Sequence, residues 1–168
     1  MQLFQSLPEE TQGTLVQVGA KAVMDPWFGA LASIPIAWQL VYLPHWIKFV
    51  SVLPWVHVNY NNVTPRYTNW DEELKSPSMS NFVKRCGSCH QNGFEAFVVF
   101  APAVLMCRMQ KANGAEVRDL CMRFLRLRVL YTILYLIGSV RIVSIFRTLS
   151  WAAGMQVLAE LYKTALLA

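Results

Sequence analysis

Long runs of uncharged residues constrain the fold of this chain more than any other feature. The 21 residues from Trp27 to Ile47 carry no formal charge, enough helix to cross a bilayer. Three later runs hold only twelve uncharged residues each: Ala96–Cys107, Val129–Val140 and Thr148–Ala159. A helix of twelve residues rises ~18 Å, against ~30 Å of hydrocarbon. Each later helix must therefore take charged or polar positions into the membrane.

Polar groups at that depth face the interior of a bundle, a wet cavity or a partner subunit, because exposure to hydrocarbon is costly. The pattern therefore predicts sites between helices or between subunits. The charged positions that flank or interrupt the short runs are Glu95, Arg123, Arg126, Arg128, Arg147 and Glu160.

The composition supports an integral membrane protein of one domain. Of the 168 residues, 55% are hydrophobic and 15% charged, which is too apolar for an ordinary soluble domain. The formal charge of +5 does not indicate a nucleic-acid partner, because Lys and Arg are scattered among apolar segments and form no stripe. It suits anionic lipid or an anionic substrate.

We expect an all-α, multi-pass membrane protein whose four transmembrane helices form a bundle. The predicted spans are residues 31–56, 84–109, 117–138 and 144–165, within a membrane domain over 30–168. Residues 1–29 are predicted to lie at the membrane interface. The start of the chain lacks a signal-peptide pattern. Basic residues balance between the two sides, so topology stays open, as does the choice between the endoplasmic reticulum and an organellar membrane.

A polar cluster, Lys84–Glu95, forms the first part of the second predicted span and runs directly into its apolar segment. His90 and Gln91 lie on the opposite side of that helix from the other polar residues of the cluster, so two surfaces of the helix carry polar groups. A cleft between helices or between subunits accommodates both polar surfaces. The alternative is a helix end whose polar groups snorkel to water. At 100° per residue, four polar side chains share one face within roughly 80°: Arg85, Ser88, Asn92 and Glu95.

A second constellation lies on the third predicted span. Arg128, Tyr131 and Tyr135 are spaced three and four residues apart, so they stack on one face within about 60°. An aromatic packing stripe with a snorkelling Arg is the alternative interpretation.

Together these residues resemble the signature of the MAPEG superfamily, the membrane-associated proteins of eicosanoid and glutathione metabolism. The resemblance rests on Arg85, on His90-Gln91-Asn92, on Glu95 and on the apolar run Phe100–Leu105, and it extends over residues 31–165. The Arg-x-x-Tyr-x-x-x-Tyr pattern of the third span is similar to that of leukotriene and prostaglandin synthases. The resemblance implies a homotrimer with sites between subunits. It also implies a glutathione-dependent transferase or peroxidase that acts on lipophilic electrophiles.

The resemblance also implies roles for individual residues, with glutathione as cosubstrate. Arg147 matches the family's catalytic Arg, which holds glutathione as its thiolate, and Arg141 is the rival for that position. A guanidinium stays charged and stabilises an adjacent thiolate. The implied glutathione-binding residues are Arg85 and Arg128 for carboxylates, Glu95 for the ammonium group, Asn92 for the amide backbone, Tyr131 and Tyr135 as further contacts, and His90 toward a neighbouring subunit's site.

Two departures from the family pattern keep a non-catalytic alternative open. The second Arg of many members is Ser88 here, and Val98 replaces a Pro. The chain could thus serve as a scaffold or accessory subunit of a larger membrane complex.

The cysteines raise a third alternative. Cys86-Gly-Ser-Cys89-His90 fits the pattern for c-type haem attachment or a redox pair, although the family resemblance already accounts for His90. No zinc site is expected, because only three candidate ligands cluster. Cys107 and Cys121 are predicted to be buried thiols, and no disulfide framework is implied.

Overall fold

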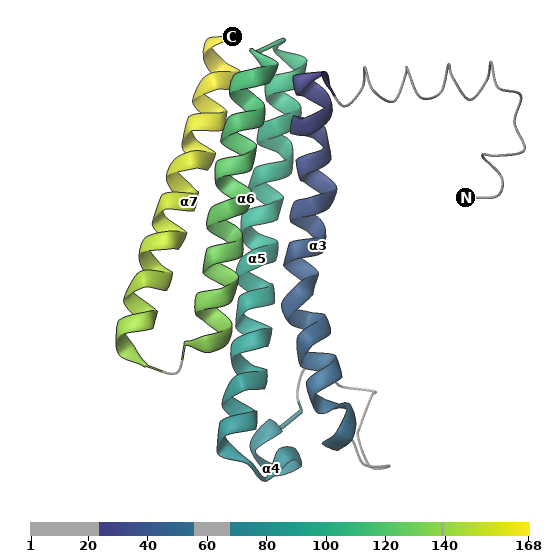
Figure 1. The fold of residues 1–168 in the computed structure, drawn as a ribbon, viewed down its shortest axis with the longest axis vertical. Helices are drawn as coiled ribbons and strands as arrows, with labels where there is room; N and C mark the ends of the chain where they lie inside the picture. The colour runs from purple at the N-terminus through teal and green to yellow at the C-terminus, as the bar shows by residue number, and fades with distance from the viewer. Residues whose placement is uncertain (1–23, 56–67, 139) are drawn as a thin grey trace, which may run out of the picture.

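The computed structural model describes residues 24–55, 68–138 and 140–168, and every regular element within these ranges is a helix. The all-α prediction is confirmed for this part of the chain. A 3-10 turn, η1 (Leu53–Trp55), follows the first helix, and the short helix α4 (Trp70–Leu74) precedes the second long one. The four long helices lie side by side (Figure 1) and are α3 (Pro26–Val52), α5 (Pro77–Met109), α6 (Gly114–Ile137) and α7 (Arg141–Leu167).

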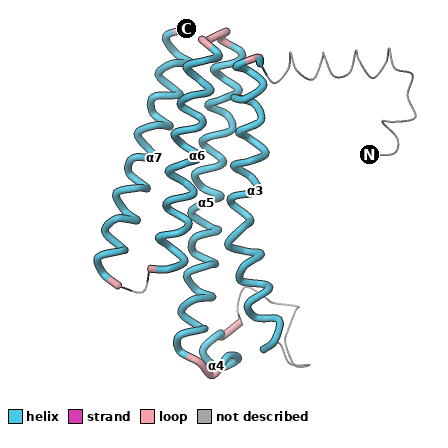
Figure 2. Tube along the Cα trace, in the orientation of Figure 1, coloured by secondary structure: helices cyan, strands magenta, loops and turns pink. Residues whose placement is uncertain are grey.

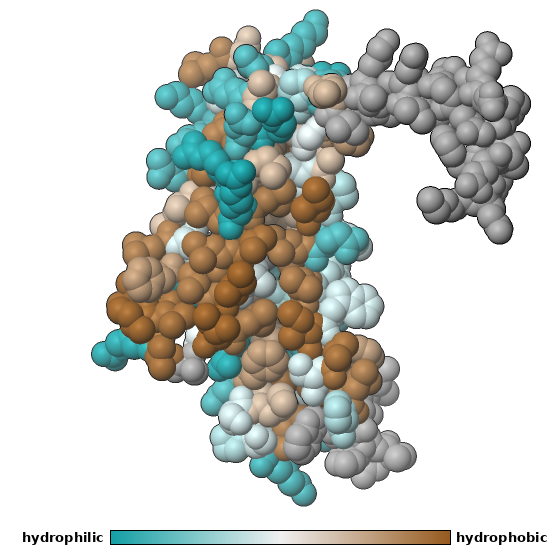
Figure 3. Space-filling view, viewed as in Figure 1, coloured by the Kyte–Doolittle hydropathy of each residue, from teal (hydrophilic) through white to brown (hydrophobic). Residues whose placement is uncertain are grey.

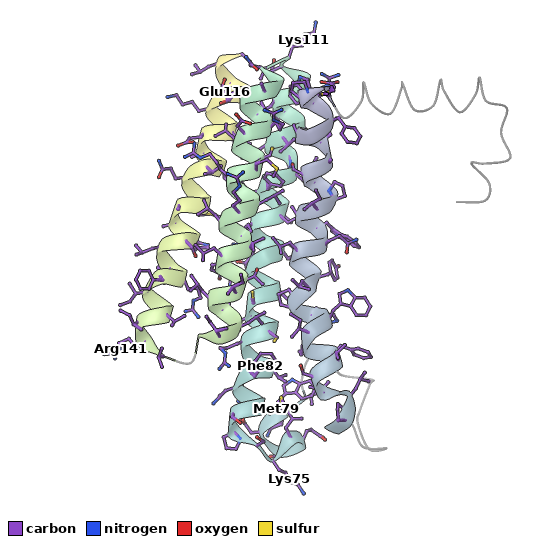
Figure 4. The ribbon with its side chains drawn as sticks, viewed as in Figure 1. Lys75, Met79, Phe82, Lys111, Glu116 and Arg141 are labelled. Carbon is purple, nitrogen blue, oxygen red and sulfur yellow. The ribbon has the colours of Figure 1, made fainter. Side chains whose placement is uncertain are left out.

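The helices alternate in direction along the bundle (Figure 2). Lys111 and Glu116 lie at one end, here called the upper end, and Lys75 lies at the lower end (Figure 4). Arg141 lies above Lys75, so the α6–α7 hairpin stops short of the lower ends of α3 and α5. Most of the predicted interfacial segment, residues 1–29, lies outside the described residues.

Three of these helices, α3, α5 and α7, are long and apolar enough to cross a membrane. The chain is therefore an integral membrane protein, as its composition predicts. α6 is also long, but its upper half is rich in charge, so a fourth span through α6 stays a prediction. The charged residues of that half are Glu116, Arg118, Asp119, Arg123 and Arg126.

Small residues let the helices approach closely. The face of α3 that meets α5 and α6 carries Ala30, Ser33 and Ala37, all with at most 4% exposure. Small residues at such positions are typical of helix contacts in membranes, where van der Waals packing drives association. Farther into the core, Phe100 of α5 stacks on Phe124 of α6 with ring centroids 4.3 Å apart. α5 and α6 each contact all three of the other long helices.

The helix ends follow local sequence signals. α5 begins at Pro77, seven residues before the predicted span, and proline is favoured at the first position of a helix. α6 begins at Gly114, where the Asn113 side chain accepts hydrogen bonds from the amides of Ala115 and Glu116. A Cβ added at Gly114 would lie 2.6 Å from the Trp27 ring, so this turn requires glycine and brings the upper ends of α3 and α6 together.

At the lower end, the Asp71 side chain links α4 to α5 through hydrogen bonds. Its carboxylate accepts hydrogen bonds from Lys84 Nζ at 2.6 Å and from Ser80 Oγ at 2.5 Å. The hydrogen bond from Lys84 is the main cause of a lowered pKa for Asp71, and the bond from Ser80 adds to it. Lys84 is thus paired with a carboxylate of α4.

We predict that acid loosens α4 from α5. The folded-state pKa of Asp71 lies below its ordinary value of 3.8. The hydrogen bonds of the ionised carboxylate therefore stabilise the contact between α4 and α5 fully above pH 3.8, and this stabilisation is lost as the pH falls through the lowered pKa. Hydrogen exchange of residues 70–75, corrected for intrinsic rates, should therefore accelerate on acidification. In Asp71→Asn the exchange should already be fast near neutral pH and change little with acid. An equal acid response in both proteins would contradict this role of Asp71.

Candidate functional site

A groove runs along the lower half of the bundle between α5, α6 and α7. It consists of two adjoining hollows of about 350 and 200 Å³, which share Tyr135 and Arg147 as lining residues. We call it the α5–α6–α7 groove. The lower hollow is lined by Asn81, Lys84, Arg85, Ser88, Tyr135, Gly138 and Arg147, and the upper one by Asn92, Tyr131, Tyr135, Arg147, Thr148 and Trp151.

Two arginines and two tyrosines form a continuous stack beside this groove. The Arg128 guanidinium lies 4.4 Å from the centre of the Tyr131 ring, and Arg147 lies 4.3 Å from the centre of the Tyr135 ring. The two rings meet edge to face with centroids 5.4 Å apart. Cation–π contacts of this kind hold a guanidinium in place without neutralising it. The spacing of three and four residues on α6 thus places both tyrosines between two cations.

One contact within α7 and one contact to α6 hold Arg147 at the rim of the groove. Its Nη2 donates to Ser144 Oγ at 3.2 Å, and its guanidinium packs over Tyr135. Arg141, the rival from the sequence, is exposed at the first residue of α7 and does not line the groove. Arg147 therefore occupies the position from which a cation can act on a bound ligand.

Arg128 lies behind the groove, inside the bundle. Its side chain belongs to a residue with 6% exposure, and its Nη1 has no hydrogen-bond partner among the described residues. A very small cavity of about 10 Å³ beside it is lined by Cys89, Gly93 and Thr132, among others. A buried guanidinium without a carboxylate is costly, which indicates a requirement other than stability.

Arg85 and Asn92 reach the groove from α5. Arg85 packs over the Phe82 ring, with its guanidinium carbon 5.8 Å from the ring centre, and its buried Nε lacks a partner among the described residues. The Asn92 side-chain nitrogen donates a hydrogen bond to the Ser88 backbone carbonyl at 2.9 Å. The side-chain oxygen of Asn92 takes no part in that bond. The groove thus offers hydrogen-bonding groups at two heights.

His90 and Glu95 lie away from the groove. His90 faces α3, where its Nδ1 lies 2.8 Å from the Val41 carbonyl oxygen and donates to it, since a carbonyl can only accept. Glu95 is exposed on the outer surface of α5 and accepts a hydrogen bond from Gln91 at 3.2 Å. The prediction that Gln91 lies on the opposite side of the helix from Glu95 is therefore wrong, because residues four apart are neighbours on a helix. Of the eight residues predicted for the site, five line the groove, Arg128 stands behind it, and these two lie elsewhere.

The sequence did not single out several neighbours of these residues. Trp151 follows Arg147 by four residues, a helical spacing that could have placed it on the same face. Asn81 precedes Arg85 of the predicted cluster by four residues, about one helical turn. His45 stacks near His90 with centroids 5.2 Å apart, but nothing in the sequence joins positions so far apart.

The haem and redox interpretations gain no support from the geometry. Cys86 and Cys89 have 0% and 2% exposure and lie inside the bundle, whereas a covalently attached haem needs both sulfurs at its edge. Within the described residues, no three metal-binding side chains gather in one place. Cys107 and Cys121 are buried thiols, as predicted.

The fold and the groove define an integral membrane protein in which two guanidinium groups line a groove beside apolar helices. A model of the MAPEG family matches residues 30–167, and the chain belongs to this family. The predicted membership is therefore confirmed. No curated protein and no solved structure matches the chain significantly.

Substitutions that remove the buried charge of Arg128 test how much this charge destabilises the fold. We predict that Arg128→Met leaves the thermal midpoint in detergent unchanged or raises it, because Met keeps the packing and removes an unpaired guanidinium. Arg128→Ala should lower stability by about 2 kcal/mol or more, since it also leaves a cavity. Equal losses in the two variants would show that the guanidinium itself holds the bundle together.

Proposed function

We propose that this protein is a glutathione-dependent transferase or peroxidase that acts on lipophilic electrophiles. Family membership supports a role in glutathione or eicosanoid metabolism at a general level. The observation that carries the specific proposal is the pair of guanidiniums, Arg85 and Arg147, that line one groove without an ion-pair partner among the described residues. Such a groove suits a small ligand with more than one negative charge.

The side chains that line the groove carry the positive charge that an anionic ligand such as glutathione requires. No carboxylate lines its two hollows among the described residues, and the third cation, Lys84, is already paired with Asp71. Glutathione carries two carboxylates and a thiol, so Arg85 binds a carboxylate and Arg147 holds the thiolate. Asn92 and the two tyrosines hydrogen-bond the peptide backbone. Arg128, behind Tyr131, adds positive potential without touching the ligand.

Arg147 activates the thiol. A thiol of ordinary pKa near ~8.5 is mostly protonated at neutral pH, and an adjacent guanidinium lowers that pKa by ~1–3 units. The thiol proton leaves to water, and the sulfur electron pair then forms a bond to the electrophilic carbon of the acceptor. In a substitution, the bond to the leaving group breaks and the leaving group departs with its electron pair. In an addition, the π electron pair of the acceptor's polarised double bond moves to its electron-withdrawing end and takes a proton from water. The acceptor reaches the sulfur from the bilayer, since exposed apolar residues flank the groove.

His90 and Glu95 fit this proposal if the protein forms the homotrimer that the family resemblance implies. Glu95 is an exposed carboxylate at the depth of the apolar spans, next to Gln91, and such a group needs a polar partner. A neighbouring protomer's groove would supply one, with Glu95 near the glutathione ammonium group. His90, fixed by Val41, would approach the same cleft from its other wall.

Alanine at the two arginines of α7 tests the catalytic assignment. Arg147→Ala should lower the rate of glutathione conjugation about 10- to 100-fold, because the bound thiol returns toward its ordinary pKa. Arg141→Ala is the matched control and should keep the rate. A pH titration of thiolate absorbance with bound glutathione should show the pKa rise in Arg147→Ala alone.

Unchanged conjugation in Arg147→Ala would contradict the role of this residue. If glutathione neither shifts the thermal midpoint of the native protein nor produces a thiolate signal, the non-catalytic scaffold becomes the better description. The substitution of Ser88 for the family's second Arg favours that alternative.

A further inference from the structure

A small cavity lies between α3, α5 and α6, and we call it the Arg128 cavity. Its volume is about 10 Å³, which is room for a single water molecule. Leu40 of α3, Gly93 of α5, and Arg128 and Thr132 of α6 are among its lining residues. The Arg128 cavity shares no lining residue with the α5–α6–α7 groove, so it is a separate feature of the bundle.

Arg128 brings a hydrogen-bond donor without an acceptor to this cavity. The residue has 6% exposure, and its Nη1 has no hydrogen-bond partner among the described residues. Figure 3 shows hydrophobic side chains over the middle of this face of the bundle, so bulk water is excluded from that part of the surface. A buried N–H group without an acceptor is costly in such surroundings. Arg128 therefore requires an acceptor inside the bundle.

Pro44 leaves an acceptor without its usual donor on the other side of the cavity. It lies inside α3 and has no N–H group, so the Leu40 carbonyl, four residues earlier, cannot form the regular helical hydrogen bond. Leu40 also lines the Arg128 cavity. In membrane helices, carbonyls that a proline frees are satisfied by neighbouring helices, by Ser or Thr side chains or by ordered water.

The neighbouring helix α5 supplies one donor to this stretch of α3. His90 Nδ1 donates to the Val41 carbonyl oxygen at 2.8 Å. One turn of α5 further up, Gly93 lines the cavity and has no side chain that could serve Leu40 in the same way. A Cβ added at Gly93 would lie 3.5 Å from Val41 Cα and 3.6 Å from Arg128 Nη2, so the glycine stands between α3 and the guanidinium.

We propose that one water molecule occupies the Arg128 cavity and bridges α6 to α3. Its oxygen accepts a hydrogen bond from Arg128 Nη1, and one of its hydrogens is donated to the Leu40 carbonyl oxygen. The Thr132 hydroxyl, in the same wall, accepts the second hydrogen. Three partners are usual for a buried water molecule. The bridge thus satisfies the donor that Arg128 buries and the acceptor that Pro44 frees.

The chemistry of the wall favours water over a dry void or an anion. Cavities that stay dry are apolar, whereas this cavity is lined by a guanidinium, a hydroxyl and a residue whose carbonyl lacks its helical donor. A halide ion is larger than water, and the Leu40 carbonyl oxygen would repel it. Water is the small ligand that can accept from Arg128 and donate to Leu40 at the same time.

The bridge gives α3 a part in a groove that it does not line. No residue of α3 lines either hollow of the α5–α6–α7 groove, but the water connects Leu40 to Arg128. The Arg128 guanidinium is then held between the water and the Tyr131 ring, whose centre lies 4.4 Å away. The proposal rests on the packing of the helices and does not depend on the activity assigned to the groove.

Gly93→Ala tests the bridge, because the added methyl group takes up space in the cavity. The methyl group makes only ordinary contacts, and alanine is favoured over glycine in a helix, so without a water this variant should be more stable than the native protein. If it displaces the water, the thermal midpoint in detergent should fall by about 2–4 °C instead. Gly87→Ala, in the same helix and with open space around the added Cβ, is the matched control and should raise the midpoint.

Two further measurements identify the groups and the ligand. In an Arg128→Met background, Gly93→Ala should lower the midpoint less, because no guanidinium then loses its partner. A structure of the native protein at a resolution that shows ordered water should have one peak within hydrogen-bond distance of Arg128 Nη1 and the Leu40 oxygen.

The proposal is wrong if Gly93→Ala raises the midpoint as the Gly87→Ala control does, or lowers it equally in both backgrounds. It is also wrong if the native structure shows a direct bond from Arg128 to Leu40, or if bromide gives an anomalous signal in the cavity, which would make the ligand an anion.

Discussion

The structure depends on charge that its short apolar spans carry into the membrane. Arg128 is the clearest case, a guanidinium with 6% exposure, stacked on Tyr131 and without a carboxylate partner among the described residues. Burying an unpaired cation costs free energy that the small-residue packing of α3, α5 and α6 must offset. The cost is understandable if the cation serves a ligand that is bound only part of the time.

Positive charge and aromatic rings together give the groove its chemistry. The rings hold two guanidiniums through their faces, so both stay charged and keep their hydrogen-bonding capacity. Lys84, by contrast, is paired with Asp71 at the lower end of the bundle. Arg85 and Arg147, which have no ion-pair partner among the described residues, therefore lie together where α5, α6 and α7 converge, close to the apolar surface from which a lipophilic acceptor would arrive.

Helical spacing within one helix was predictable from the sequence, and contacts between helices were less so. Arg128, Tyr131 and Tyr135 share a face because residues three and four apart must do so. The pattern could not say that Arg128 points inward while Tyr135 lines the groove, since that depends on how α6 is rotated against α3. Glu95 shows the same limit. Helical spacing predicts on which side of α5 it lies, but not which part of the protein contacts that side. The pairing of His45 with His90 needed the three-dimensional fold.

Determining the structure of the protein with bound glutathione would test the central claim most directly. The account predicts the glutathione sulfur beside the Arg147 guanidinium in the α5–α6–α7 groove, with a carboxylate on Arg85 and the peptide along Asn92 and Tyr131. Glutathione bound outside this groove, or Arg147 turned away to lipid headgroups with the groove closed, would contradict it.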